Sequence, residues 1–373
     1  MSPRRAGAAC AVLLFFCSSS HPGAASAQAG RKISRSFEVL QKLLEVPGVS
    51  GHEEKVRETI LGLLPDWARA VARVDSRGNL LVEAGKGGVR VLFIAHMDET
   101  GYAITSIERD GTARLKSLGG FFNTLYEAHT VVVHTRGGER RAVIRPRRDY
   151  LRPADAPRPP TDEELVLDFG TDRREETLQL GVVPGDWITA EKRFRRLAGR
   201  MGSGRSVDDR AGCTALVQAA HRLDPSRLRN RVTLAWSVEE EIGLRGAEAL
   251  AASSRFDVVF AVDTFVSSDS PLESKGFALG VLGEGPVLRA MDNSNLAPEA
   301  QLARVRELAG ARGMSLQIGL THGGNDGSVF PVHGAVDVPL SWPTIYSHSP
   351  VELIQEDDLD RLGDLVALLA EGW

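Results

Sequence analysis

Residues 231–246 read R-V-T-L-A-W-S-V-E-E-E-I-G-L-R-G. The apolar part, V-T-L-A-W, is typical of a strand that is buried on both faces of a parallel sheet. Three consecutive glutamates, Glu239, Glu240 and Glu241, follow shortly after it. Carboxylates at the end of a buried strand are costly to remove from water unless a partner compensates their charge. The stretch therefore predicts an α/β core with a functional site at the end of a strand.

Other predicted strands and loops lead to the same kinds of side chain. The run V-L-F-I-A-H-M-D leads to His96 and Asp98, and the run V-V-F-A-V-D leads to Asp263. The loop S-V-D-D brings Asp208 to the start of a predicted helix, and Y-S-H adds His348. Taken singly, each has a common structural explanation, such as a helix N-cap for Asp208. Their coincidence at strand and helix ends favours a shared metal site.

The kinds of ligand narrow the chemistry of that site. Histidine nitrogen with carboxylate oxygen and no thiolate suits Zn, Co or Mn in a catalytic site. Carboxylates outnumber histidines, which indicates two metal ions that share one bridging carboxylate. Such a pair polarises a carbonyl group and lowers the pKa of a bridging water, and a free glutamate then transfers the proton to the leaving amine. The pattern predicts metal-assisted hydrolysis of an amide bond.

The chain of 373 residues is long enough for about two domains. Alternating helix and strand patterns extend to about residue 100 and resume after about residue 191. Between these positions, short β-rich runs alternate with glycine pairs, which suits a small all-β module. A Pro/Arg-rich loop at 145–160 is expected to be exposed. We predict an α/β catalytic domain formed by 28–100 and 192–373, interrupted by an inserted β domain at 101–191.

The first 27 residues have the order of a secretory signal. Pro3-Arg4-Arg5 precedes an apolar run, and A-A-S-A-Q places a cleavage site after Ala27. A buried N-terminal helix is the alternative. Removal of this segment leaves one cysteine, Cys213, and hence no internal disulfide. We expect a secreted or periplasmic protein without a membrane span, and the net charge of −4 argues against a general nucleic-acid binder.

The motifs resemble those of the TET-type, glutamyl-aminopeptidase-like metallo-aminopeptidases of metallopeptidase family 42, in the dinuclear zinc exopeptidase clan. The resemblance runs from V-P-G-V-S-G-H-E-E at residue 46 to H-S-P-V-E at residue 352. Between them lie A-H-M-D-E-T-G, V-D-D-R-A-G, E-E-E-I-G-L-R-G-A, H-G-G-N-D-G and Y-S-H-S-P-V-E. The family implies a three-layer α/β/α sandwich with an inserted β-barrel-like domain, peptide substrates, and a homo-oligomer that is a dimer or larger.

The resemblance also implies a role for each candidate ligand. Asp208 would bridge two divalent ions, most often zinc, with cobalt or manganese as alternatives. His96 and Asp263 would complete one ion's site, and Glu241 and His348 would complete the other's.

The candidate catalytic residues implied by the family are Glu240 and Asp98. Glu240 would be the general base, and Asp98 would orient the ligand His96. A cis peptide bond would join Asp208 to Asp209. Glu239 stands where the family commonly has glutamine and is expected to be a structural neighbour.

Departures from the family pattern leave another reaction open. Ile345 replaces a usual arginine, and Asn325 replaces a usual threonine. These changes motivate the alternative of a metal-dependent deacylase or amidohydrolase that acts on a non-peptide amide. A non-enzymatic binding protein with a relict site would lack a ligand, and none of the five is missing.

Overall fold

The computed structural model describes residues 35–147, 161–271 and 279–373. The predicted signal peptide lies outside the described residues, as does most of the predicted Pro/Arg-rich loop. The N-terminal part of the described chain forms α1 (Arg35–Leu44), α2 (Glu54–Leu63) and α3 (Asp66–Val71).

A sheet of 12 strands forms the larger part of the structure. Its main path runs in the order β1 (Arg73–Val74), β2 (Leu80–Ala84), β12 (Arg231–Ser237), β3 (Arg90–His96), β13 (Val258–Val266), β17 (Leu340–Ile345), β18 (Glu352–Gln355), β11 (Met201–Gly204) and β10 (Arg195–Arg196). The remaining strands are β14 (Val287–Met291), β15 (Gln317–Leu320) and β16 (Val336–Asp337). The central strands β12, β3, β13 and β17 are parallel, so their carboxyl ends lie at one edge of the sheet.

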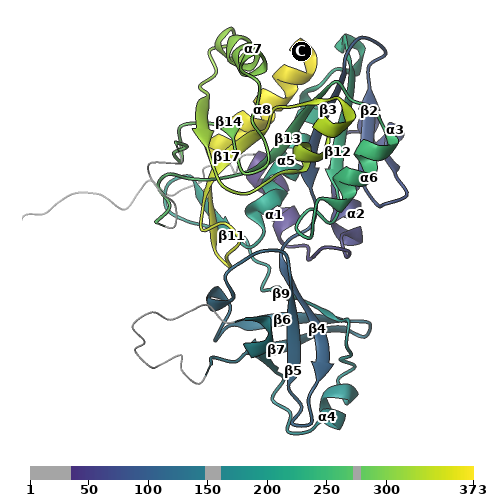
Figure 1. The fold of residues 1–373 in the computed structure, drawn as a ribbon, viewed down its shortest axis with the longest axis vertical. Helices are drawn as coiled ribbons and strands as arrows, with labels where there is room; N and C mark the ends of the chain where they lie inside the picture. Colours follow the sequence, from purple (N-terminus) through teal and green to yellow (C-terminus); the bar gives the residue numbers. More distant parts are fainter. Residues whose placement is uncertain (1–34, 148–160, 272–278) are drawn as a thin grey trace, which may run out of the picture. The chain divides into compact units, whose positions relative to one another are not determined.

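Helices cover both faces of this sheet, and the sequence of β3 explains why. Along β3, Val91, Phe93 and Ala95 enter one apolar core, whereas Leu92 and Ile94 enter another. The first core packs against α1, α2, α3, α5 (Val207–Arg222), α7 (Glu299–Gly310) and α8 (Glu356–Gly372). The second packs against α6 (Arg245–Ser253). Because successive strand residues face opposite sides, a wholly apolar strand requires two covering layers. The predicted three-layer α/β/α fold is confirmed (Figure 1).

Small side chains let α5 approach the sheet closely. A Cβ atom on Gly212 would lie 2.7 Å from the carbonyl oxygen of Val262 in β13. Cys213 is completely buried among the apolar residues of the first core. This close packing carries the start of α5 to the edge where the parallel strands end.

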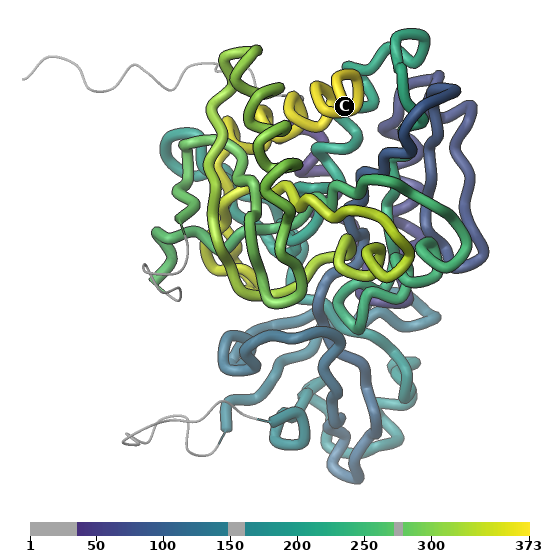
Figure 2. The backbone as a smooth tube through the Cα atoms, turned by 45° about the horizontal axis from the view of Figure 1, so that its top comes forward, coloured from purple at the N-terminus to yellow at the C-terminus, as the bar shows by residue number. Residues whose placement is uncertain are grey.

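The inserted segment forms a closed barrel in the order β4 (Gly101–Ile107), β5 (Ala113–Leu118), β8 (Val166–Asp168), β7 (Gly138–Ile144), β6 (Thr130–Thr135) and β9 (Trp187–Ala190). The chain leaves the large sheet after β3 and returns to it at β10 (Figure 2). The all-β expectation was incomplete, because the segment also contains the short helix α4 (Arg174–Gln179). Glutamates in the first turn of α4 favour a helix there through the backbone dipole.

Short 3-10 turns complete the described chain: η1 (Asn123–Leu125), η2 (Asp162–Glu164), η3 (Pro225–Arg227), η4 (Asp326–Val329) and η5 (Pro331–His333). Within the described residues, no helix has the length and apolar character needed to cross a membrane.

Candidate metal centre and active site

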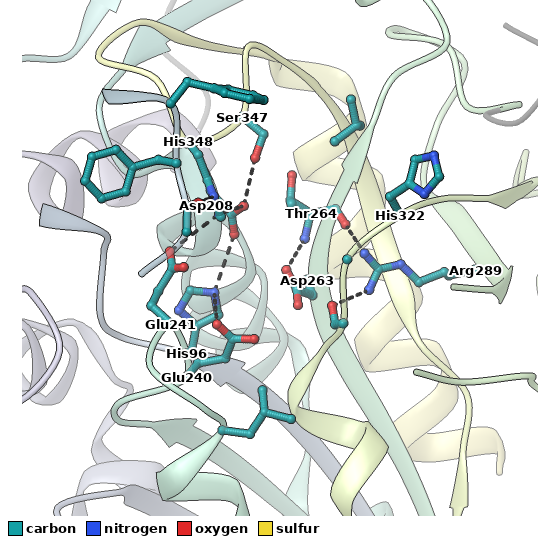
Figure 3. Close-up of a pocket in the computed structure, with 17 residues that line it drawn as sticks. His96, Asp208, Glu240, Glu241, Asp263, Thr264, Arg289, His322, Ser347 and His348 are labelled. Atoms are coloured by element: carbon teal, nitrogen blue, oxygen red, sulfur yellow. Dashed lines mark hydrogen bonds and ion pairs between the residues drawn. The ribbon is translucent and has the colours of Figure 1, made fainter. Parts of the chain in front are cut away.

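The predicted site residues meet at the carboxyl edge of the parallel strands. His96 is the last residue of β3, Asp263 belongs to β13, and Glu240 and Glu241 follow β12. The start of α5 brings Asp208, and the loop after β17 brings His348. Together they line a cavity of ≈ 690 Å³, which Figure 3 shows in close-up. Parallel alignment explains the meeting, because it places the ends of β3, β12 and β13 at one edge.

Asp208 lies between two histidines. Its Oδ1 atom is 3.4 Å from Nε2 of His96, and its Oδ2 atom is 3.3 Å from Nε2 of His348. Ser347 donates a hydrogen bond to Oδ2 at 3.0 Å. The peptide bond from Asp208 to Asp209 is cis, as the family resemblance implied. A carboxylate whose two oxygens face two different imidazoles has the arrangement of a bridging metal ligand.

Two overlapping sets of predicted ligands share Asp208. Donor atoms of His96, Asp208 and Asp263 all lie within 4.8 Å of one another, and all three side chains are buried. On the other side, Nε2 of His348 is 3.6 Å from Oε1 of Glu241. The structure thus brings together all five predicted ligands in the two predicted groups.

The electrostatics of the cavity suit a cation. Burial, with a smaller contribution from nearby Asp208, raises the pKa of Glu241 to about 7 and that of Asp263 to about 6. Burial also raises the pKa of Glu240 well above its usual range. Although burial opposes it, the Glu240, Asp208 and Asp98 carboxylates raise the pKa of His96 well above its ordinary value. Buried acids in such proximity repel one another, and a divalent ion offsets that repulsion.

Asp98 lies behind the cavity wall and holds several groups of the site. Its Oδ1 atom is 3.4 Å from Nδ1 of His96, and its backbone oxygen is 3.1 Å from the same nitrogen. The carboxylate also accepts the backbone N–H groups of Glu240 at 3.0 Å and Glu241 at 3.2 Å, and the hydroxyl of Ser50 at 2.6 Å. The contact with His96 matches the predicted orienting role. The hydrogen bonds from the backbone of Glu240 and Glu241 to Asp98 were not predicted, because a short motif does not reveal its distant partners.

The carboxylate of Glu239 lies against two arginines and not among the predicted ligands. Its carboxylate forms ion pairs with Arg77 and with Arg245, the latter at 3.3 Å. Glu239 is not one of the described residues that line the cavity. These contacts agree with the structural role that the sequence predicts for Glu239.

The sequence did not predict the residues that form the cavity wall opposite His96 and His348. Arg289 is buried there and donates hydrogen bonds to the backbone oxygens of Thr264 at 2.9 Å and Gly324 at 3.1 Å. Further lining residues are Phe121, Phe122, Leu244, Val266 and His322. Arg289 carries no recognisable ligand motif, so only its place beside Asp263 reveals it.

The two departures from the family pattern do not reach this wall. Asn325 is buried, and its side chain donates to Asp292 at 2.8 Å and accepts from the N–H of Gly327 at 2.8 Å. Ile345 pairs with Leu353 between β17 and β18. Neither residue is among those described as lining the cavity, so neither change alters its surface directly.

Comparison with known proteins places the chain in a family. Residues 78–365 match the M42 glutamyl aminopeptidase family. The chain belongs to this family. The M42 chain is 30% identical over 349 residues to the putative aminopeptidase FrvX of Escherichia coli (strain K12), covering 90% of this chain and 96% of the relative. It is 29% identical over 347 residues to the lysyl aminopeptidase of Pyrococcus furiosus, with coverage of 90% and 96%.

Solved structures agree with this assignment. The TET1 peptidase of Pyrococcus horikoshii matches with a TM-score of 0.81 and 37% identity, covering 91% of this M42 chain and 100% of the solved chain. An aminopeptidase of Desulfurococcus kamchatkensis matches with a TM-score of 0.83 and 28% identity, covering 91% and 95%. The protein is therefore a metallopeptidase of the aminopeptidase type with the TET fold.

Proposed function

We propose that this M42 protein is an exported aminopeptidase that uses two divalent ions to remove N-terminal residues from peptides. The observation that carries the proposal is the position of Asp208, with one carboxylate oxygen facing His96 and the other facing His348. Asp263 and Glu241 would complete the two sites. Zinc suits these nitrogen and oxygen donors, as do cobalt and manganese.

The donor set fits the ions by its own chemistry. Three carboxylates and two neutral imidazoles supply oxygen and nitrogen ligands, and three negative charges offset most of the charge of two divalent ions. When bound, such ions polarise the scissile carbonyl group and make a water molecule acidic near neutral pH.

Glu240 is the proposed general base. Its side chain lines the cavity, and its Oε2 atom lies 3.9 Å from Nε2 of His96. The bond from its N–H to Asp98 holds the backbone that carries it. Glu240 would accept the proton of the attacking water and return it to the leaving nitrogen of the peptide bond.

The test uses aminoacyl-p-nitroanilides that span acidic, basic and apolar residues. The mature protein, residues 28–373, is stripped with a chelator and refilled separately with Zn, Co and Mn, and Glu240→Gln is run alongside. We expect metal-restored cleavage and a loss of kcat of roughly 10²–10⁴-fold in the variant, with unchanged metal content. Wild-type kcat in Glu240→Gln would refute its role as the base. If the wild type binds two ions but cleaves none of the anilides, the search for substrates would turn to acylated non-peptide amines.

Two further parts of the proposal concern location and assembly. The order of charge, apolar run and A-x-A site in residues 1–27 supports export to the periplasm or medium. The N-terminal sequence of the exported fraction should begin at Gln28, and a cytosolic, unprocessed chain would contradict this.

The similar solved structure of a TET1 peptidase is a dodecamer, which supports self-association of this chain. Light scattering after size-exclusion chromatography should give a mass of two or more chains.

A further inference from the structure

The two proposed ion sites rest on different parts of the protein. His96 ends β3 and Asp263 lies within β13, so the first site stands on two central strands of the sheet. His348 instead lies in the loop between β17 and β18, with a backbone φ of 60°. That left-handed conformation is unfavourable for a residue with a side chain. The loop therefore needs contacts from elsewhere to hold the imidazole in place.

One buried carboxylate supplies such contacts to both sides of the second site. Glu352 is completely buried. Its Oε1 atom accepts the backbone N–H of His348 at 2.7 Å, and its Oε2 atom accepts the backbone N–H of Asp208 at 3.2 Å. Arg205, also buried, lies with its guanidinium 3.4 Å from Oε1 and donates to the backbone oxygen of Thr100 at 2.6 Å. Glu352 thus ties the histidine loop to the start of α5.

The inserted segment supplies the remaining contacts. The backbone oxygen of Gly120 accepts a hydrogen bond from Nδ1 of His348, which directs Nε2 toward Asp208 and Glu241. The adjacent Gly119, with a φ of 93°, lies against the other ligand, since a Cβ atom placed there would be 3.2 Å from Oε2 of Glu241. A carbonyl that fixes the outer nitrogen of a ligating histidine commonly determines how well the metal is held.

We propose that Glu352 and the barrel loop Gly119–Gly120 position the second ion's ligands, so that this ion depends on them whereas the ion held by His96 and Asp263 does not. This inference rests on the proposed two-ion site. Glu352 is a positioning residue, because it touches the backbone of two ligands and does not line the cavity among the described residues. The inserted domain then influences ion occupancy as well as bordering the cavity.

The decisive variant is Glu352→Gln. A carboxamide keeps the shape of the side chain, but it has a single acceptor oxygen and cannot accept both backbone N–H groups. One of the two backbone N–H groups then faces an amide N–H₂ group, so the tie between the His348 loop and the start of α5 is lost, whereas His96 and Asp263 stay on β3 and β13. We expect the second ion to bind roughly 10–100-fold more weakly and the first to keep its affinity within about threefold.

Glu356→Gln is the matched control. Glu356 is also a buried glutamate, four residues further along, and it pairs with Arg196 at 2.7 Å and Arg200 at 3.5 Å. Neither arginine is a proposed ligand. The same charge is removed from the interior, but both ions should bind as in the wild type.

The measurement is metal binding by the mature full-length protein, independent of activity. Chelator-stripped protein is titrated with Co²⁺ and followed by its visible absorption, and zinc content is measured after dialysis against buffered free Zn²⁺. Wild type and Glu356→Gln should bind two equivalents, whereas Glu352→Gln should show one tight equivalent and one weak one. The melting temperature of each metal-free variant monitors folding.

A second variant decides the matter if Glu352→Gln does not fold. Gly119→Ala places a methyl group 2.6 Å from Cγ2 of Thr100 and 3.2 Å from Cβ and Oε2 of Glu241, and should weaken the same ion. Two equivalents at wild-type affinity, or equal weakening of both ions, would overturn the inference while leaving the proposed function intact. A wild type that binds fewer than two ions would instead refute the proposed function itself.

Discussion

His134 should make the protein lose stability in acid. Its ring is 8% exposed and stacks on Trp187, with the ring centres 3.8 Å apart. Its Nε2 atom is 2.9 Å from the hydroxyl oxygen of Thr189, and Nδ1 is 3.9 Å from the half-exposed Glu139. Burial lowers the pKa of His134 from 6.5 to about 4.

Nearby charges act on the same group with smaller effects. Glu99 raises the pKa of His134, whereas Lys55, Lys192 and His52 lower it, and the value of about 4 includes these effects. The folded protein therefore binds the proton only near pH 4, whereas the unfolded chain binds it near pH 6.5. Stability from the neutral ring is fully present above pH 6.5 and is lost as the pH falls toward 4. Between pH 7 and pH 4.5, these two pKa values give a loss of about 2.5 kcal/mol in the free energy of unfolding.

The assay is urea unfolding of metal-free protein at pH 7 and pH 4.5, followed by circular dichroism. His134→Phe is the comparison, because phenylalanine keeps a ring against Trp187 and cannot titrate. Loss of the partner of Thr189 lowers the stability of the variant equally at both pH values, and the other titrating groups are common to both proteins. We expect the wild type to lose about 2.5 kcal/mol more than the variant. Parallel pH dependences of the two proteins would refute the reasoning.

Two substitutions test the packing that supports the site. Glu99→Ala should lower the free energy of unfolding by about 3–5 kcal/mol in urea denaturation, because Glu99 is fully buried and its oxygens lie 2.8 and 2.9 Å from Nζ of Lys192, whose charge would lose its partner. Gly246→Ala in α6 should cost about 1–3 kcal/mol by the same measurement, because its Cβ atom would lie 2.4 Å from the backbone oxygen of Val238.

Matched controls separate these causes from a general effect of substitution. Glu83→Ala removes a half-exposed glutamate 3.8 Å from Arg231 and should change stability by less than about 1 kcal/mol. Gly62→Ala in α2 adds a methyl group with nothing within 4 Å, and should stabilise the helix by about 0.5–1 kcal/mol. Equal losses in the buried and exposed variants would contradict the packing argument.

The layered fold was predictable because its signal is local. A strand such as β3, apolar from Val91 to Ala95, requires cover on both faces, and the helical patterns on either side supply it. The barrel was predictable as a β-rich insertion, but α4 was missed because its six residues give too little periodicity to distinguish a helix from a loop. Closure of the barrel depends on pairing between distant strands, such as β4 with β9, which no local pattern specifies.

The ligand candidates were predictable for a similar reason. Each lies in or just after the last part of a strand or near the start of a helix, and parallel strands bring their carboxyl ends to one edge of a sheet. The residues that support them were not predictable in the same way. Glu352 is part of a recognised motif, yet its hold on Asp208 spans 144 residues, and the contact of His348 with Gly120 spans 228. Arg289 lies on another strand altogether and carries no motif.

By itself, the sequence determined which chemical groups stand at the ends of which strands, because apolar runs and the polar residues that follow them are properties of neighbouring positions. Only the tertiary structure decided that Asp208 faces two histidines, that Asp98 holds the backbone of Glu240 and Glu241, and that the inserted barrel reaches His348. These contacts join segments that are far apart along the chain. Their distances and directions depend on how helices and strands pack, and that packing is a property of the whole fold.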